Sequence, residues 1–160
     1  MSAGIPSSWT GNGFTNARYV FGRGEYEYWR DHSVEPDKIA VFNDSVRPVV
    51  DAGRADLVAS DARLTDEITL IPTPGHSPGH ISIHIRSDGE EALLTDDVAH
   101  HPCQMAHLDW SSTADSDPVQ SAVTRRELFG RFADTTTLVI GGHFNAGHIR
   151  RDGDAFKFIV

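Results

Sequence analysis

The sequence predicts a mixed α/β fold, because segments with the spacing of strands and segments with the spacing of helices alternate along the chain. Residues 80–86 alternate strictly between polar side chains and isoleucines, which is typical of a strand with two different faces. Residues 117–133 carry apolar side chains at helical spacing. We expect these to form one buried helix face, made by Val119, Ala122, Val123, Phe129, Phe132 and Ala133.

The first third of the chain is expected to contain a short strand and two helices. Residues 1–13 have no regular pattern, and we predict a flexible arm there. A strand over residues 17–21 and a helix over residues 24–32 follow. A longer helix is expected over residues 35–53, with a kink at Pro48, because proline cannot donate a backbone hydrogen bond.

The remainder of the chain contains mainly strand patterns. Asp88-Gly89 and Asp152-Gly153 are dipeptides typical of tight hairpin turns. A polar loop is expected to end near Asp115, just before the helix. We expect strands at residues 57–58, 68–71, 80–86, 92–95, 137–140, 148–151 and 156–160.

Length, charge and cysteine content limit the classes of function. The chain has 160 residues and a formal net charge of -9, so we expect one domain over residues 14–160 that binds neither nucleic acid nor an anionic membrane. The single cysteine, Cys103, excludes an intramolecular disulfide. We expect a cytoplasmic protein, because the sequence has no pattern of a signal peptide and no apolar run of membrane-spanning length.

Three of the predicted strands are followed by a candidate metal ligand. His76 lies in the run TPGHSPGH, Asp97 in LLTDDVAHHP and His143 in VIGGHF. Ligands at strand ends stand on a rigid frame, and the neighbouring glycines let the backbone come close to an ion. Imidazole and carboxylate together suit zinc, and also manganese or iron. The pattern therefore indicates a metal site.

These three motifs, in this order, resemble the later motifs of the metallo-β-lactamase superfamily. The segment FTNARYVFGRGEYEYW at residues 14–29 resembles the one that follows the first metal motif in lactonase-like and phosphotriesterase-like members. The resemblance implies an α/β chain that forms the C-terminal part of an αβ/βα sandwich. It also implies that His76 binds one metal, that Asp97 bridges two metals and that His143 binds the second.

Two features depart from the pattern of that superfamily. The residue before the bridging aspartate is usually glycine, but here it is Asp96, so both Asp96 and Asp97 stay open as ligands, with the following Val98 favouring Asp97. The first metal motif, His-x-His-x-Asp-His, does not occur in this sequence. We therefore expect an incomplete sandwich, whose exposed strands or apolar face favour self-association or a completing second chain.

The resemblance implies a metal-dependent hydrolase that attacks a small-molecule lactone, ester or similar substrate with hydroxide held by two zinc ions. His100 stands near the position of a substrate-polarising tyrosine in lactonase-like members, which implies a catalytic role for it. We expect this activity to be impaired in the present chain. Two alternatives are a non-catalytic remnant or partner subunit that binds another chain, and a standalone hydrolase with one metal on His76, Asp97, His143 and a fourth group such as His100.

The neighbouring histidines and aromatic residues receive simpler interpretations. His80 is expected to support its loop through a hydrogen bond, since histidines beside metal sites often do so. His84 is expected on the surface, and Trp110 in the core.

Overall fold

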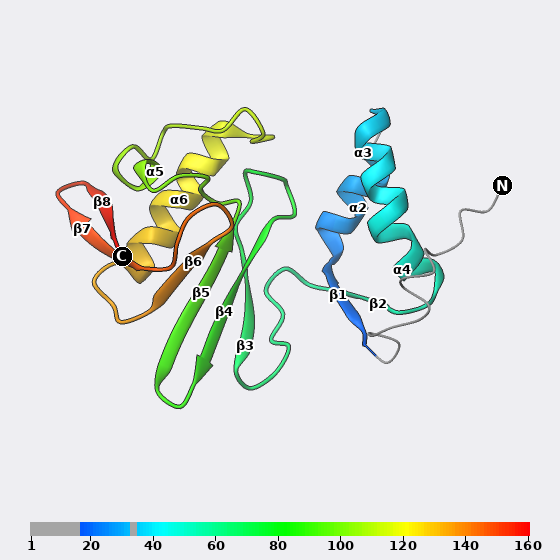
Figure 1. The fold of residues 1–160 in the computed structure, drawn as a ribbon, viewed down its shortest axis with the longest axis horizontal. Coiled ribbons are helices and arrows are strands. Elements are labelled where there is room, and N and C mark those ends of the chain that lie inside the picture. The colour runs from blue at the N-terminus through cyan, green and yellow to red at the C-terminus, as the bar shows by residue number, and fades with distance from the viewer. Residues whose placement is uncertain (1–16, 33–34) are drawn as a thin grey trace. The chain divides into compact units, whose positions relative to one another are not determined.

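The computed structural model describes residues 17–32 and 35–160 (Figure 1). The chain divides into two compact units, of which the first ends at Ala59 and the second begins at Ser60. The arm predicted over residues 1–13 lies outside the described residues. No helix within the described ranges is long and apolar enough to cross a membrane.

The first unit contains two parallel strands with helices between them in the chain. β1 (Tyr19–Gly22) pairs in parallel with β2 (Ala55–Val58), as expected for strands joined by a helical crossover. The helices of this unit are α2 (Arg23–His32), α3 (Pro36–Val41) and α4 (Arg47–Asp51).

The predicted helix over residues 35–53 is interrupted before the proline rather than kinked at it. Residues Phe42–Val46 form a π-helical turn between α3 and α4. Pro48 lies in the first turn of α4, where its missing N–H costs little. Because Pro48 cannot donate to the carbonyl of Asp44, the regular hydrogen-bond ladder stops one turn earlier.

The second unit contains a four-stranded sheet and a separate hairpin. The sheet strands are β3 (Ile68–Pro72), β4 (Ile81–Ser87), β5 (Glu90–Asp96) and β6 (Leu138–Gly141), and the hairpin strands are β7 (His148–Asp152) and β8 (Ala155–Ile159). The strand order is β3-β4-β5-β6, antiparallel except for the parallel β5–β6 pair. The turn predicted at Asp88-Gly89 joins β4 to β5, with φ values of 53° and 85°.

Helix α6 (Pro118–Phe132) confirms the helix predicted over residues 117–133, and it packs on one face of the sheet. The side chain of Asp117 caps it by accepting a hydrogen bond of 2.9 Å from the backbone N–H of Gln120. A single helical turn, α5 (Cys103–Ala106), lies within the predicted polar loop. The core between helix, sheet and hairpin includes Leu93, Met105, Leu128, Phe129, Phe132, Val139, Ile149 and Phe156.

The prediction of the buried face of α6 is wrong for the first half of the helix. Val119 is 76% exposed and Val123 is 44% exposed. Three polar residues take the buried positions there, namely Ser121, Thr124 and Arg125. The reason is that this half of the helix packs against polar loops at the end of the sheet, where Thr124 donates a hydrogen bond to the carbonyl of Pro74.

The polar face of β4 is likewise turned inward. Ser82 and His84 are buried, so the expectation that His84 lies on the surface is wrong. The ring of His84 packs edge-on against Phe132, and its Nε2 lies 3.1 Å from Oε2 of Glu91. This hydrogen bond lowers the pKa of Glu91. Burial of a polar side chain is tolerated here because each buried group has a partner.

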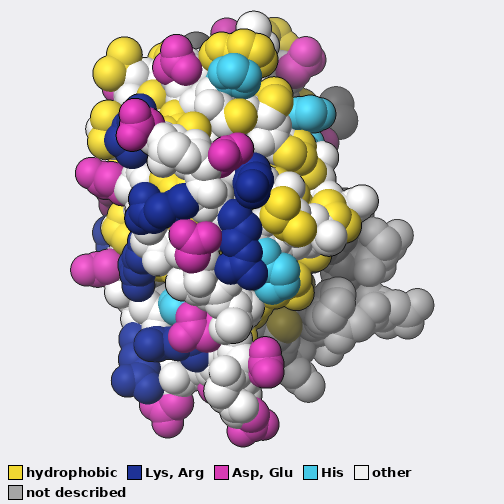
Figure 2. All heavy atoms as spheres, turned by 90° about the vertical axis from the view of Figure 1, so that its left-hand side faces the viewer, with side chains coloured by type: hydrophobic (Ala, Val, Ile, Leu, Met, Phe, Trp, Pro, Cys, Tyr) yellow, Lys and Arg dark blue, Asp and Glu magenta, His cyan; other side chains and the backbone are white. Residues whose placement is uncertain are grey.

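Charged side chains of both signs lie on one face of the molecule. Figure 2 shows acidic and basic side chains lying among one another on the face that it presents. Trp110, expected in the core, is 53% exposed and stacks on His107 with ring centroids 4.0 Å apart.

We expect two substitutions in α6 to differ in their effect on the free energy of unfolding, because one residue is buried and the other is exposed. Phe129→Ala removes a fully buried ring and should lower the free energy of unfolding by about 3–5 kcal/mol. Val119→Ala, on the exposed side of the same helix, should change it by no more than about 0.5 kcal/mol. Urea-induced unfolding measures both values. Equal losses for the two variants would contradict the packing described here.

Candidate metal centre

The four residues predicted to act in the site lie together at one end of the sheet. His76 follows β3, Asp97 and His100 follow β5, and His143 follows β6. Asp97 is at the centre of the group. Its Oδ2 lies 3.4 Å from Nε2 of His76, and its Oδ1 lies 2.7 Å from Nε2 of His143 and 3.6 Å from Nε2 of His100.

The spacing of these donor atoms suits a cation. The ligand atoms of His76, Asp97 and His100 all lie within 4.8 Å of one another. Ligand atoms around a tetrahedral zinc, with bonds of about 2.0–2.1 Å, are about 3.3 Å apart. The separations of 3.4 Å and 3.6 Å to Asp97 are close to that value. The 2.7 Å between His143 and Asp97 is instead a hydrogen-bond distance.

The structure brings Asp97 into the group and leaves Asp96 outside it. The side chain of Asp96 is 71% exposed, and its Oδ2 comes no closer than 4.0 Å to Nε2 of His80. Asp96 has a φ of 48°, a left-handed conformation in which glycine is favoured and aspartate is tolerated. This backbone conformation gives a physical reason why glycine would suit the position before Asp97.

His100 is a largely buried imidazole beside a carboxylate. Burial lowers the pKa of His100, and the charge of Asp97 partly opposes that change. Its ring stacks on that of His143, with centroids 4.8 Å apart. Its Nδ1 is buried and has no hydrogen-bond partner among the described residues. Its other nitrogen, Nε2, faces the carboxylate of Asp97 at 3.6 Å.

Behind the four residues lies a buried ion pair that the sequence analysis missed. Asp115 Oδ1 lies 3.3 Å from Nδ1 of His76, and Asp115 Oδ2 lies 3.6 Å from Nη1 of Arg125. Both charged side chains are 0% exposed. Burial lowers the pKa of Arg125, and Asp115 opposes that change. No motif marks this pair, because Asp115 lies in a predicted polar loop and Arg125 is a single polar residue among the apolar positions of the predicted helix.

The loop that carries His76 is fixed by close backbone contacts. Gly75 has a φ of 138°, and a Cβ added there would lie 2.5 Å from the Cα of Ser121 in α6. The backbone N–H of Ser116 donates to the carbonyl of His76, and that of Asp117 donates to Gly75. Only glycine permits this approach of loop and helix.

His80 supports the same loop, as predicted. Its Nδ1 lies 2.8 Å from Oγ1 of Thr73, which in turn lies 3.1 Å from Oγ of Ser82. All three side chains are buried. The loop after β3 is therefore anchored to the sheet on one side and to α6 on the other.

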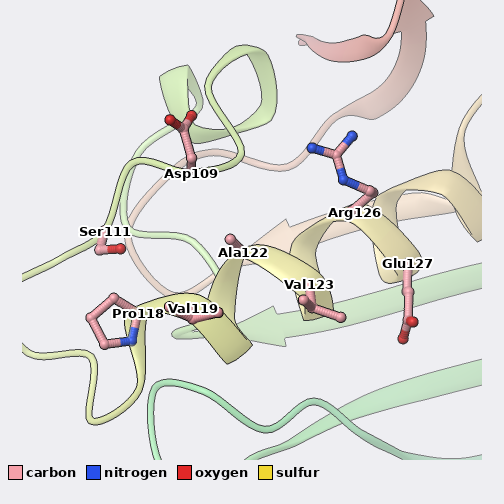
Figure 3. A pocket seen from close by; sticks show the side chains of 8 residues that line it. All are labelled: Asp109, Ser111, Pro118, Val119, Ala122, Val123, Arg126 and Glu127. Atoms are coloured by element: carbon pink, nitrogen blue, oxygen red, sulfur yellow. The ribbon is translucent and has the colours of Figure 1, made fainter.

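A separate hollow lies on the outer side of α6 (Figure 3). Its volume is about 460 Å³, and Val119 and Val123 contribute apolar side chains beside Arg126. None of its lining residues belongs to the His/Asp group, so it is not a pocket that this group forms. The lining residues are Asp109, Ser111, Pro118, Val119, Ala122, Val123, Arg126 and Glu127.

We expect a substitution at Gly75 to lower the free energy of unfolding, because the loop lies close to α6 there. Gly75→Ala adds both an unfavourable φ and a contact with the backbone of α6. Gly89→Ala is the matched control, because Gly89 also has a positive φ but open space around it. The control should cost about 1–2 kcal/mol, and Gly75→Ala about 1–3 kcal/mol more, as measured by urea-induced unfolding. Equal free energies of unfolding for the two variants would contradict a close contact between Gly75 and the backbone of α6.

Several solved structures share the fold of this chain. No protein-family model matches the chain, and the curated proteins yield no match to its sequence. The hydrolase AbOPH of the beta lactamase superfamily is 20% identical, with a TM-score of 0.77 over 91% of this chain and 55% of that one. AidC, a dizinc quorum-quenching lactonase, gives the same values. A probable metal-dependent hydrolase from Staphylococcus aureus is 19% identical, with a TM-score of 0.72 over 92% of this chain and 53% of that one.

These likenesses confirm the predicted fold. The chain has the mixed α/β fold of part of the metallo-β-lactamase superfamily hydrolases. It spans about half the length of the solved structures it matches.

Proposed function

We propose that this chain carries part of the metal centre of a metal-dependent hydrolase. The observation that carries this proposal is the convergence of three imidazoles on the carboxylate of Asp97 at one end of the sheet. The fold supports it, because structures with this fold include hydrolases and a dizinc lactonase. We propose a lactone, ester or similar small molecule as the substrate.

In this proposal His76, Asp97 and His143 hold the metal. Asp97 is suited to bridge two ions, because Oδ2 faces His76 while Oδ1 faces His143. A bound divalent cation supplies Lewis acidity and lowers the pKa of water to near neutrality. Zinc, manganese and iron all accept these donors. His100 contacts the substrate as a neutral imidazole and helps to orient its carbonyl oxygen.

A two-metal site requires more ligands than these side chains offer. We propose that ligands beyond residues 1–160, in the same polypeptide or in a second one, supply the remainder. The chain on its own would then bind metal weakly and turn over slowly. If the second polypeptide instead uses this chain only as a binding partner, the His/Asp group would remain without activity in the assembly.

A second candidate is a hydrolase with a single metal held by His76, Asp97 and His100. The specific observation in its favour is that the donor atoms of these three residues lie within 4.8 Å of one another. Two histidines and one carboxylate are a sufficient protein ligand set for a catalytic zinc. His143 would then lie at the exposed edge of the group, hydrogen-bonded to Asp97.

We expect zinc binding to depend on His76. Titration of the metal-free chain against a chromophoric chelator should show zinc binding, and His76→Ala should weaken it by at least about tenfold. His107→Ala is the control, because His107 stacks on Trp110 away from the group. Equal affinities for the wild-type chain and His76→Ala would contradict the proposed metal centre.

Two further variants separate the one-metal and two-metal candidates. With a bridging Asp97, His143→Ala should lower the zinc content at saturation, and His100→Ala should leave it unchanged. With a single metal on His100, His100→Ala should abolish tight binding while His143→Ala retains it. Inductively coupled plasma mass spectrometry of each variant, after equilibration with zinc, measures the content.

A further inference from the structure

We infer that the buried pair of Asp115 and Arg125 is a positioning device for His76, which holds the proton on Nδ1 and leaves Nε2 free to bind the metal. This inference rests on the proposed metal centre and assigns roles to two residues outside it. A positioning residue acts through the ligand and does not touch the metal or the substrate itself.

The ring of His76 lies between two carboxylates. Its two nitrogens face two different carboxylates, with Nε2 3.4 Å from Asp97 and Nδ1 3.3 Å from Asp115. A carboxylate only accepts hydrogen bonds, and of these two contacts the one between Nδ1 and Asp115 has hydrogen-bond geometry, so we place the proton on Nδ1. The remaining lone pair of the neutral ring is then on Nε2, which faces the proposed metal position.

The carboxylate of Asp115 is held by several partners. An ionised carboxylate with a fully buried side chain is stable only with partners that offset its desolvation. Asp115 has three such partners: Nδ1 of His76, the guanidinium of Arg125 and the backbone N–H of Ser112 at 3.2 Å. The carboxylate is therefore fixed in place from several directions, and His76 is fixed against it.

Arg125 connects the loops that carry His76 and Asp97. Its Nη1 donates to the carbonyl of Val98, the residue after Asp97, at 3.2 Å, and its Nε donates to the carbonyl of Leu108 at 2.9 Å. The same guanidinium pairs with Asp115. One buried side chain of α6 thus sets the separation between the loop of Asp97 and the carboxylate that orients His76.

The alternative is that the ion pair of Asp115 and Arg125 only stabilises the fold and has no effect on the ring of His76. The chain offers a matched control for it. A second histidine–carboxylate contact joins buried His84 to partly exposed Glu91 at 3.1 Å, near the opposite end of β5 from Asp97. Glu91→Gln makes the same chemical change as Asp115→Asn, outside the metal group.

The experiment is long-range proton–nitrogen NMR of the imidazole rings in the whole, metal-free chain, with His76 assigned from the spectrum of His76→Ala. In the wild-type chain we expect His76 to be protonated on Nδ1. In Asp115→Asn we expect a mixture of tautomers and zinc affinity lowered by about 10–100-fold. Glu91→Gln should change the signals of His84 and leave the zinc affinity unchanged.

Each outcome decides the inference. A wild-type His76 protonated on Nε2 overturns it, whether or not Asp115→Asn folds. A folded Asp115→Asn with wild-type zinc affinity and tautomer also overturns it. If the wild-type chain binds no zinc, the proposed function fails instead, and the tautomer of His76 still reports whether Asp115 orients the ring.

Discussion

The arrangement of the second unit depends on one buried ion pair, between Arg125 and Asp115. Two charges that are fully removed from water cost free energy unless ion pairs and hydrogen bonds offset their desolvation. Their partners are therefore obligatory, and these partners belong to the loops that carry the candidate ligands: His76, and Val98 beside Asp97. A change in either loop would leave a buried charge with one partner fewer. The stability of the fold and the geometry of the His/Asp group thus rest on the same contacts.

The sheet explains why those loops meet. β5 and β6 run in parallel, so the residues that follow them, Asp97 and His143, emerge at the same edge. β3 is antiparallel to β4 and β4 to β5, so the loop after β3 reaches that edge too. The helix that covers the sheet presents polar side chains at this end and apolar ones, such as Phe129, at the other. A rigid apolar frame therefore supports a polar group at its edge.

The local patterns of the sequence predicted most of this architecture, and tertiary contacts account for the rest. Some features depend only on residues that are close together in the sequence, and the sequence predicts them. They are the alternation at β4, the turn at Asp88-Gly89 and the motifs around His76, Asp97 and His143. The contacts of Arg125 and His84 do not follow from such local patterns, because each is made with a residue elsewhere in the chain, Asp115 or Phe132. The role of Asp115 depends in addition on the loop reaching His76, 39 positions away in the chain.

The most direct test of the central claim is anomalous X-ray diffraction at the zinc absorption edge, from crystals of the whole chain grown with zinc. The account predicts an anomalous peak at Nε2 of His76 and the carboxylate of Asp97, with Asp115 hydrogen-bonded to Nδ1 on the far side of the ring. A peak coordinated by Nδ1 of His76, or zinc bound only at other histidines, would contradict it.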